Sequence, residues 1–134
     1  MVRSLFAPAA ILAALGLPFM TGCPTVEPCV ETTLTALQAD VFNGSCATSS
    51  CHGGGAPSRN LDMNDGATHG STVGVAGVEP GTTRIVAGNP DESLFYQVLL
   101  EGVGNTRRMP PGFELDECEV EAVRVWIADG AQDN

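Results

Sequence analysis

The segment Cys46-Ala47-Thr48-Ser49-Ser50-Cys51-His52-Gly53 carries the most informative chemistry of this chain. Two thiols stand close together, and an imidazole directly follows the second. Thiols and imidazoles bind soft and borderline metals, whereas two nearby cysteines in an oxidising compartment also form structural disulfides. Which use applies depends on the rest of the sequence. It shows how large an apolar core the polypeptide can form without a bound group or a disulfide.

The composition predicts one small domain that is short of core material. The chain has 134 residues, 43% of them apolar but only 5% aromatic, with Gly 16 and Pro 9. Such domains usually need disulfides, a metal or a bound group to fold stably. The formal net charge of −10 argues against nucleic acid as a partner. We find no dinucleotide-binding glycine motif and no P-loop.

The N-terminus predicts export. Residues 1–22 combine Arg3 with a short apolar run, which is typical of a signal peptide and too interrupted by proline for a membrane span. Met20-Thr21-Gly22-Cys23 resembles the bacterial lipobox, which implies lipidation of Cys23; an ordinary cleavage site is the alternative. We therefore expect a membrane-anchored lipoprotein, periplasmic or at the cell surface, with residues 23–31 as a lipidated tether and 32–134 as the domain.

Three helices are predicted within a mostly α fold with long Gly-rich loops. Apolar residues repeat at helical spacing over 33–42, and Asn43-Gly44 predicts the end of that helix. Residues 53–88 lack a sustained period and are predicted to be mostly loop. A second helix is expected from the Asn89-Pro90 cap, and a third from Asp116, with Glu119 completing a capping box.

The segment 46–53 resembles the haem-attachment motif of c-type cytochromes, although four residues rather than two separate its cysteines. The resemblance covers approximately 32–131 and implies a small monohaem cytochrome c domain that transfers electrons and is not an enzyme. It implies that Cys46 and Cys51 hold one haem c through thioethers and that His52 is an axial iron ligand. A structural Cys46–Cys51 disulfide stays open as the alternative.

The same resemblance implies a second axial ligand from a proline-containing loop downstream, where Met109-Pro110-Pro111 stands. Proline restricts the preceding Met109 to an extended conformation, which suits a rigidly presented thioether. His69 is the main alternative sixth ligand, and Met63 is a weaker one. The family's crossing first and last helices would also bring Cys29 and Cys118 within disulfide reach, and Arg107 and Arg108 could pair with haem propionates.

The acidic surface predicts redox partners with a basic docking patch. Two other functions stay open. One is a copper-binding lipoprotein that uses Cys46, Cys51, His52 and Met109 as ligands. The other is a disulfide-stabilised surface lipoprotein without haem.

Overall fold

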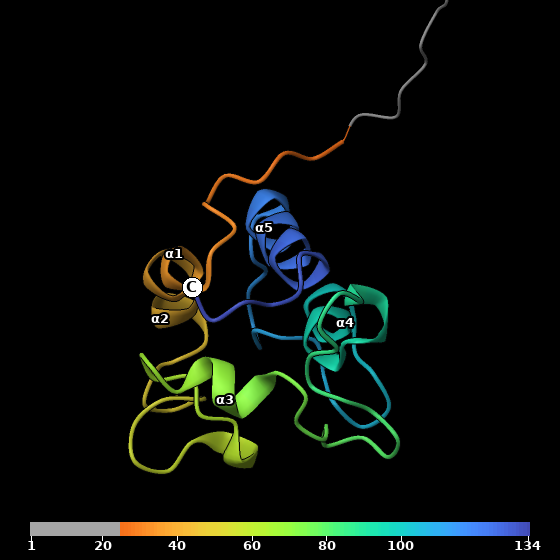
Figure 1. The fold of residues 1–134 in the computed structure, drawn as a ribbon. Helices are drawn as coiled ribbons and strands as arrows, with labels where there is room; N and C mark the ends of the chain where they lie inside the picture. Colours follow the sequence, from red (N-terminus) through yellow and green to blue (C-terminus); the bar gives the residue numbers. More distant parts are fainter. Residues whose placement is uncertain (1–24) are drawn as a thin grey trace, which may run out of the picture.

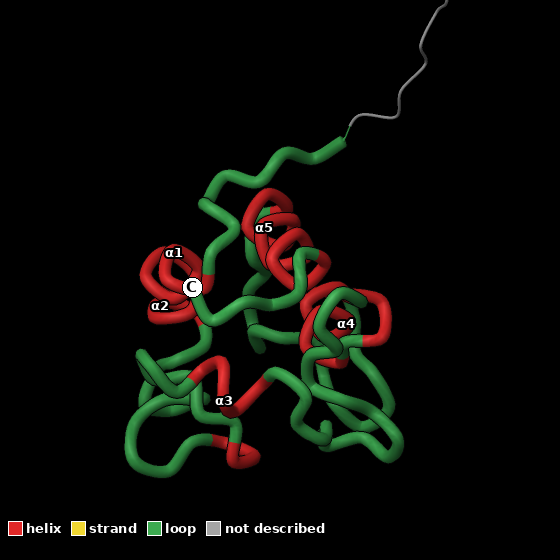
Figure 2. Tube along the Cα trace, in the orientation of Figure 1, coloured by secondary structure: helices red, strands yellow, loops and turns green. Residues whose placement is uncertain are grey.

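Helices joined by long loops form the part of the chain that the structure describes, residues 25–134 of a computed structural model (Figure 1). Within that part, β structure is limited to isolated bridges such as Val73–Ile85, so the mostly α prediction is confirmed (Figure 2). The expected signal peptide 1–22 and the lipidation site Cys23 lie outside the described residues. None of the helices described is long and apolar enough to cross a membrane.

The first helical segment runs without interruption from α1 (Leu34–Leu37) through a π-helical turn (Gln38–Phe42) to α2 (Asn43–Ser45). The Thr33 side chain caps it by accepting the Ala36 N–H. The predicted end at Asn43-Gly44 is wrong, because the chain stays helical through Gly44. At the actual end, the Phe42 carbonyl accepts the Cys46 and Ala47 amides at 2.8 and 2.7 Å. The helix therefore leads directly into the first cysteine.

The last helix, α5 (Glu117–Ala128), begins where the sequence predicts. Asp116 and Glu119 form the complete capping box. Trp126 and Val123 of α5 share one apolar core with Phe42 and Leu37 of the first segment, all nearly inaccessible to solvent. This contact between the two ends of the chain is the main apolar core of the domain.

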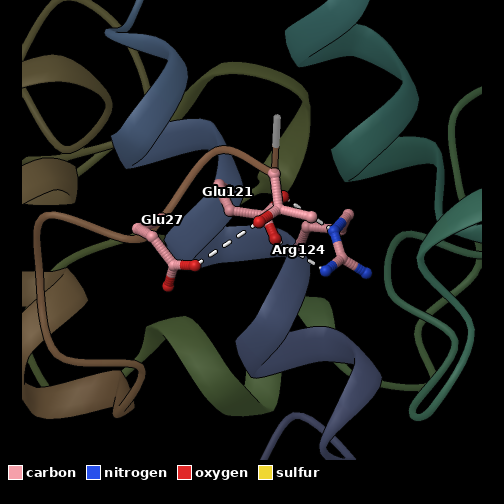
Figure 3. Close-up of polar contacts among 4 residues, drawn as sticks. Glu27, Glu121 and Arg124 are labelled. Carbon is pink, nitrogen blue, oxygen red and sulfur yellow. Dashed lines mark hydrogen bonds and ion pairs between the residues drawn. The ribbon is translucent and has the colours of Figure 1, made fainter. Parts of the chain in front are cut away.

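A disulfide reinforces the same junction. Cys29 and Cys118 are bonded, with their Cα atoms 5.2 Å apart. The N-terminal segment is thus tied to the start of α5. Figure 3 shows the Glu121–Arg124 ion pair of that helix, whose shortest N–O distance is 2.6 Å.

The region between these helices holds more structure than the sequence predicts. A 3-10 turn (Ser58–Asn60) and α3 (Thr68–Thr72) lie inside the predicted loop. The Asn89-Pro90 cap starts only a 3-10 turn (Pro90–Glu92), and α4 (Leu94–Leu100) begins after it. Ser93 interrupts the predicted helix because it is extended, fully buried and bridged to Thr83.

Candidate functional site

A cavity of about 380 Å³ lies between three stretches of chain. The first is the loop that follows the first helical segment. The second comprises the residues before α4 together with α4 itself, and the third is the loop between α4 and α5. The volume falls within the roughly 300–1,000 Å³ typical of small-molecule and cofactor sites. Apolar side chains of α4 form part of its wall, among them Leu94, Phe95 and Val98. The shape and lining suit a largely apolar ligand.

The segment 46–53 forms one side of this cavity. Cys46, Cys51 and His52 all line it, and both cysteines are free thiols. The residues between the cysteines fold into a turn in which Thr48 O accepts the Cys51 amide at 2.9 Å. Cys46 O accepts the His52 amide at 3.0 Å. The longer spacing is therefore taken up by the turn, and both sulfurs stay at the cavity.

The two thiols differ in environment. Burial, followed by the charges of Cys51 and Glu119, raises the pKa of Cys46 to about 12. Hydrogen bonds from Thr48 and then Ser50 lower the pKa of Cys51 below its ordinary value. Cys51 is consequently the more readily ionised thiol of the pair.

The His52 imidazole is held by a backbone group. Its Nδ1 lies 3.1 Å from the Ser58 carbonyl oxygen. Because a carbonyl only accepts, the bonded neutral tautomer carries its proton on Nδ1 and its lone pair on Nε2. Burial lowers the pKa of His52 against the opposing hydrogen bonds to the backbone of Ser58 and Leu61, which favours the neutral ring. A neutral imidazole with its other nitrogen fixed by a hydrogen bond is the usual form of a histidine metal ligand.

Met109 also lines the cavity, from the loop before α5. Its amide donates to the Val98 carbonyl at 2.7 Å, which fixes the loop against α4. Met63 lines the same cavity but is only 1% exposed and belongs to the apolar core. His69 lies elsewhere, beside a second cavity of about 270 Å³, with its Nε2 3.0 Å from the Ala131 carbonyl oxygen. The structure thus brings Met109 and Met63 to His52's cavity, but not His69.

The charge around the cavity is opposite to that of the chain. Arg59, Arg84 and Arg107 line it, and no Asp or Glu does. Arg108 is turned to other partners, since its Nε donates to Leu99 O at 3.1 Å and its guanidinium pairs with Glu114. Sequence reasoning had singled out Arg107 and Arg108 but missed Arg59 and Arg84, because no local pattern marks a loop arginine that reaches a distant segment.

Within residues 25–134, no three His, Cys, Asp or Glu side chains are grouped to hold a metal ion. A haem iron takes only two axial side chains, so the lack of such a group there has no bearing on haem binding. No protein-family model, curated protein or solved structure matches this chain. The site must therefore be interpreted from its own geometry and chemistry.

Proposed function

We propose that this protein is a one-electron carrier of the monohaem c-type cytochrome class. The observation that carries the proposal is the convergence on one cavity of Cys46, Cys51, His52 and Met109, although Met109 is far from the others in sequence. Two thiols and a backbone-fixed imidazole on one side, with a thioether among the other lining residues, match the donor set of a covalently held haem.

The lining residues fit a haem in three further respects. Both thiols are free, so each is available for a thioether bond. Leu94, Phe95 and Val98 supply apolar contact for a porphyrin face. Arg59 and Arg107 are exposed cations at the cavity and would pair with its propionate carboxylates. A large apolar group in this place would also supply the core material that the aromatic-poor sequence lacks.

Each of these residues would then have a separate role. Cys46 and Cys51 would hold the porphyrin edge, and His52 Nε2 and Met109 Sδ would take the two axial positions. When bound, the haem iron supplies the chemistry by alternating between its ferrous and ferric states. With both axial positions taken by side chains, no open coordination site remains for a substrate, so we propose electron transfer and no catalysis.

The partner would be another redox protein. The described residues carry five arginines and sixteen acids, a net charge of 5 − 16 = −11. All the acids lie outside the cavity lining. A basic patch on the partner would therefore be attracted to the acidic surface outside the cavity rather than to its lining, in a salt-dependent association. Lipidation of Cys23 would keep the domain at a membrane surface.

The decisive experiment compares the wild-type protein, expressed with a haem maturation system, with the Cys46→Ser/Cys51→Ser variant. We expect the wild type to keep its haem through acid–acetone extraction and to give a pyridine haemochrome spectrum, and the variant to keep none. Ser49→Ala, in the same turn, is the control and should behave as wild type. A colourless wild type, or covalent haem in the double variant, would refute the proposal; copper in the colourless protein would favour the metal-binding alternative.

The sixth ligand is tested separately. Replacing Met109 with Ala should abolish the weak methionine-to-iron absorption band and lower the reduction potential, because thioether ligation raises it. Covalent haem should remain, since both thiols are intact. Met63→Leu and His69→Ala are the matched controls and should leave both readouts unchanged. Loss of the band in Met63→Leu, with retention in Met109→Ala, would reassign the ligand to Met63. Absence of the band from the wild type, with a potential that changes in His69→Ala, would reassign it to His69.

A further inference from the structure

We propose that Arg84 is a positioning residue that aims the His52 imidazole into the cavity by holding the backbone of the segment 58–61. The inference rests on the proposed function, since it gives His52 the axial role. It is carried by a chain of hydrogen bonds that the motif itself does not contain.

Arg84 clamps two loops through backbone oxygens. Its Nη1 donates to Ser71 O at 2.7 Å and to Asn60 O at 3.1 Å, and its Nη2 donates to Arg59 O at 3.0 Å. A guanidinium presents several donors in a rigid plane, which a lysine ammonium on a flexible stem does not reproduce. The side chain thus fixes two consecutive carbonyls of the segment 58–61 against α3.

Those two residues need such a clamp. Arg59 and Asn60 both have left-handed backbones, with φ of 59° and 53°. Residues other than glycine rarely adopt this left-handed backbone conformation, and they remain in it when the surrounding structure holds them. Both residues are exposed, so burial does not hold them. Two bonds from Arg84, to the carbonyls of Arg59 and Asn60, hold them together with the turn's own bonds from the Asn60 amide to Pro57 O and from the Leu61 amide to Ser58 O.

The clamped segment in turn holds His52. Ser58, which directly precedes Arg59, accepts the His52 Nδ1–H through its carbonyl at 3.1 Å, and its own amide donates to Cys51 O at 2.8 Å. Two residues after the segment, the Met63 amide donates to His52 O at 2.7 Å. A shift of the Arg59-Asn60 backbone would therefore move the acceptor that orients the ring. Outer partners of this kind set the orientation and basicity of a ligating imidazole.

Arg124 provides the contrast needed for a test. Its guanidinium donates to the Glu121 carboxylate, and it does not line the cavity. Replacing either arginine by lysine keeps the charge, so a difference between the two variants reports on the clamp alone.

The experiment uses the ferrous holoprotein, in which solvent exchange of the His52 Nδ1–H is followed by NMR. In Arg84→Lys we expect this exchange to accelerate, because the Ser58 carbonyl that accepts the Nδ1–H would no longer be held in place. The reduction potential should rise, because a less firmly hydrogen-bonded imidazole is a weaker donor to iron. Arg124→Lys should leave both values at the wild-type level. Wild-type exchange and potential in a folded Arg84→Lys holoprotein would overturn the inference while leaving haem binding intact.

A second pair of variants keeps the inference testable if Arg84→Lys does not accumulate. Glycine adopts the Arg59 backbone without steric cost, whereas alanine does not. Arg84→Lys/Arg59→Gly should therefore yield more holoprotein, with slower Nδ1–H exchange, than Arg84→Lys/Arg59→Ala. Equal behaviour of the two double variants would overturn the role given to Arg84. A wild type without covalent haem would instead refute the proposed function itself.

Discussion

The helical junction and the segment 46–63 are stabilised in different ways. At the junction, Phe42, Val123 and Trp126 are almost fully buried, and a disulfide joins the same two parts of the chain. In the segment 46–63, only Cys46 and Met63 belong to the buried apolar core, and the segment is held mainly by hydrogen bonds to backbone groups. The comparison indicates that packing determines the fold here, whereas individual polar contacts shape the site.

Removing the disulfide should have the largest effect, and it should act on the junction. The bond joins residues separated by 89 positions, and closing a loop of that length contributes about 4–5 kcal/mol by the chain-entropy estimate. We expect Cys29→Ser/Cys118→Ser to lower the free energy of unfolding by up to that amount, measured by urea denaturation of the holoprotein.

The haem spectrum of the same variant tests whether the disulfide acts on the helical junction alone. Because neither cysteine lines the cavity, the haem absorption of the folded protein should match that of the wild type. A changed spectrum in the folded state, with unaltered stability, would show that the disulfide supports the site rather than the junction.

The difference between the regions also explains which helices could be predicted. The start of α5 follows from Asp116 and Glu119, a signal contained within one turn. The start of α4 was placed too early, because Ser93 is committed to a bridge with Thr83 and its hydroxyl donates to Asn89 O at 2.8 Å. A cap at Asn89 cannot reveal that competition, since it depends on a strand-like contact with another segment.

The site could be predicted only where its chemistry lies in one short stretch. Cys46, Cys51 and His52 are close together in the sequence, and their spacing alone predicts a candidate site. Arg84 was not found, because its importance arises from three carbonyls that only the folded chain brings to it. Nor does any pattern indicate that Ser58 provides the acceptor for His52.

A smaller effect is expected from a glycine inside the segment 46–63. A Cβ on Gly53 would lie 1.9 Å from the Ala47 carbonyl oxygen, so the turn between the two cysteines would have to move. We expect Gly53→Ala to cost about 1–3 kcal/mol, as overpacking usually does, and to reduce the yield of covalent haem. Gly55→Ala is the matched control, because nothing lies within 4 Å of its added Cβ. Equal stability and haem yield in the two variants would show that this turn is not closely packed.

The smallest effect should come from an exposed polar contact between two loops beside the cavity. The Glu79 carboxylate accepts the Thr106 hydroxyl at 2.7 Å and the Asn105 amide at 3.1 Å, and these bonds lower its pKa below the ordinary 4.5. A depressed carboxyl pKa stabilises the folded state above the ordinary pKa, and that contribution is lost as the pH falls through the lower folded-state pKa. Glu79→Gln should therefore melt slightly below the wild type at pH 7, and the difference should vanish in acid. A gap for Glu79→Gln that persisted unchanged below the folded-state pKa would mean that the two loops are held by packing, as the helical junction is, and not by this carboxylate.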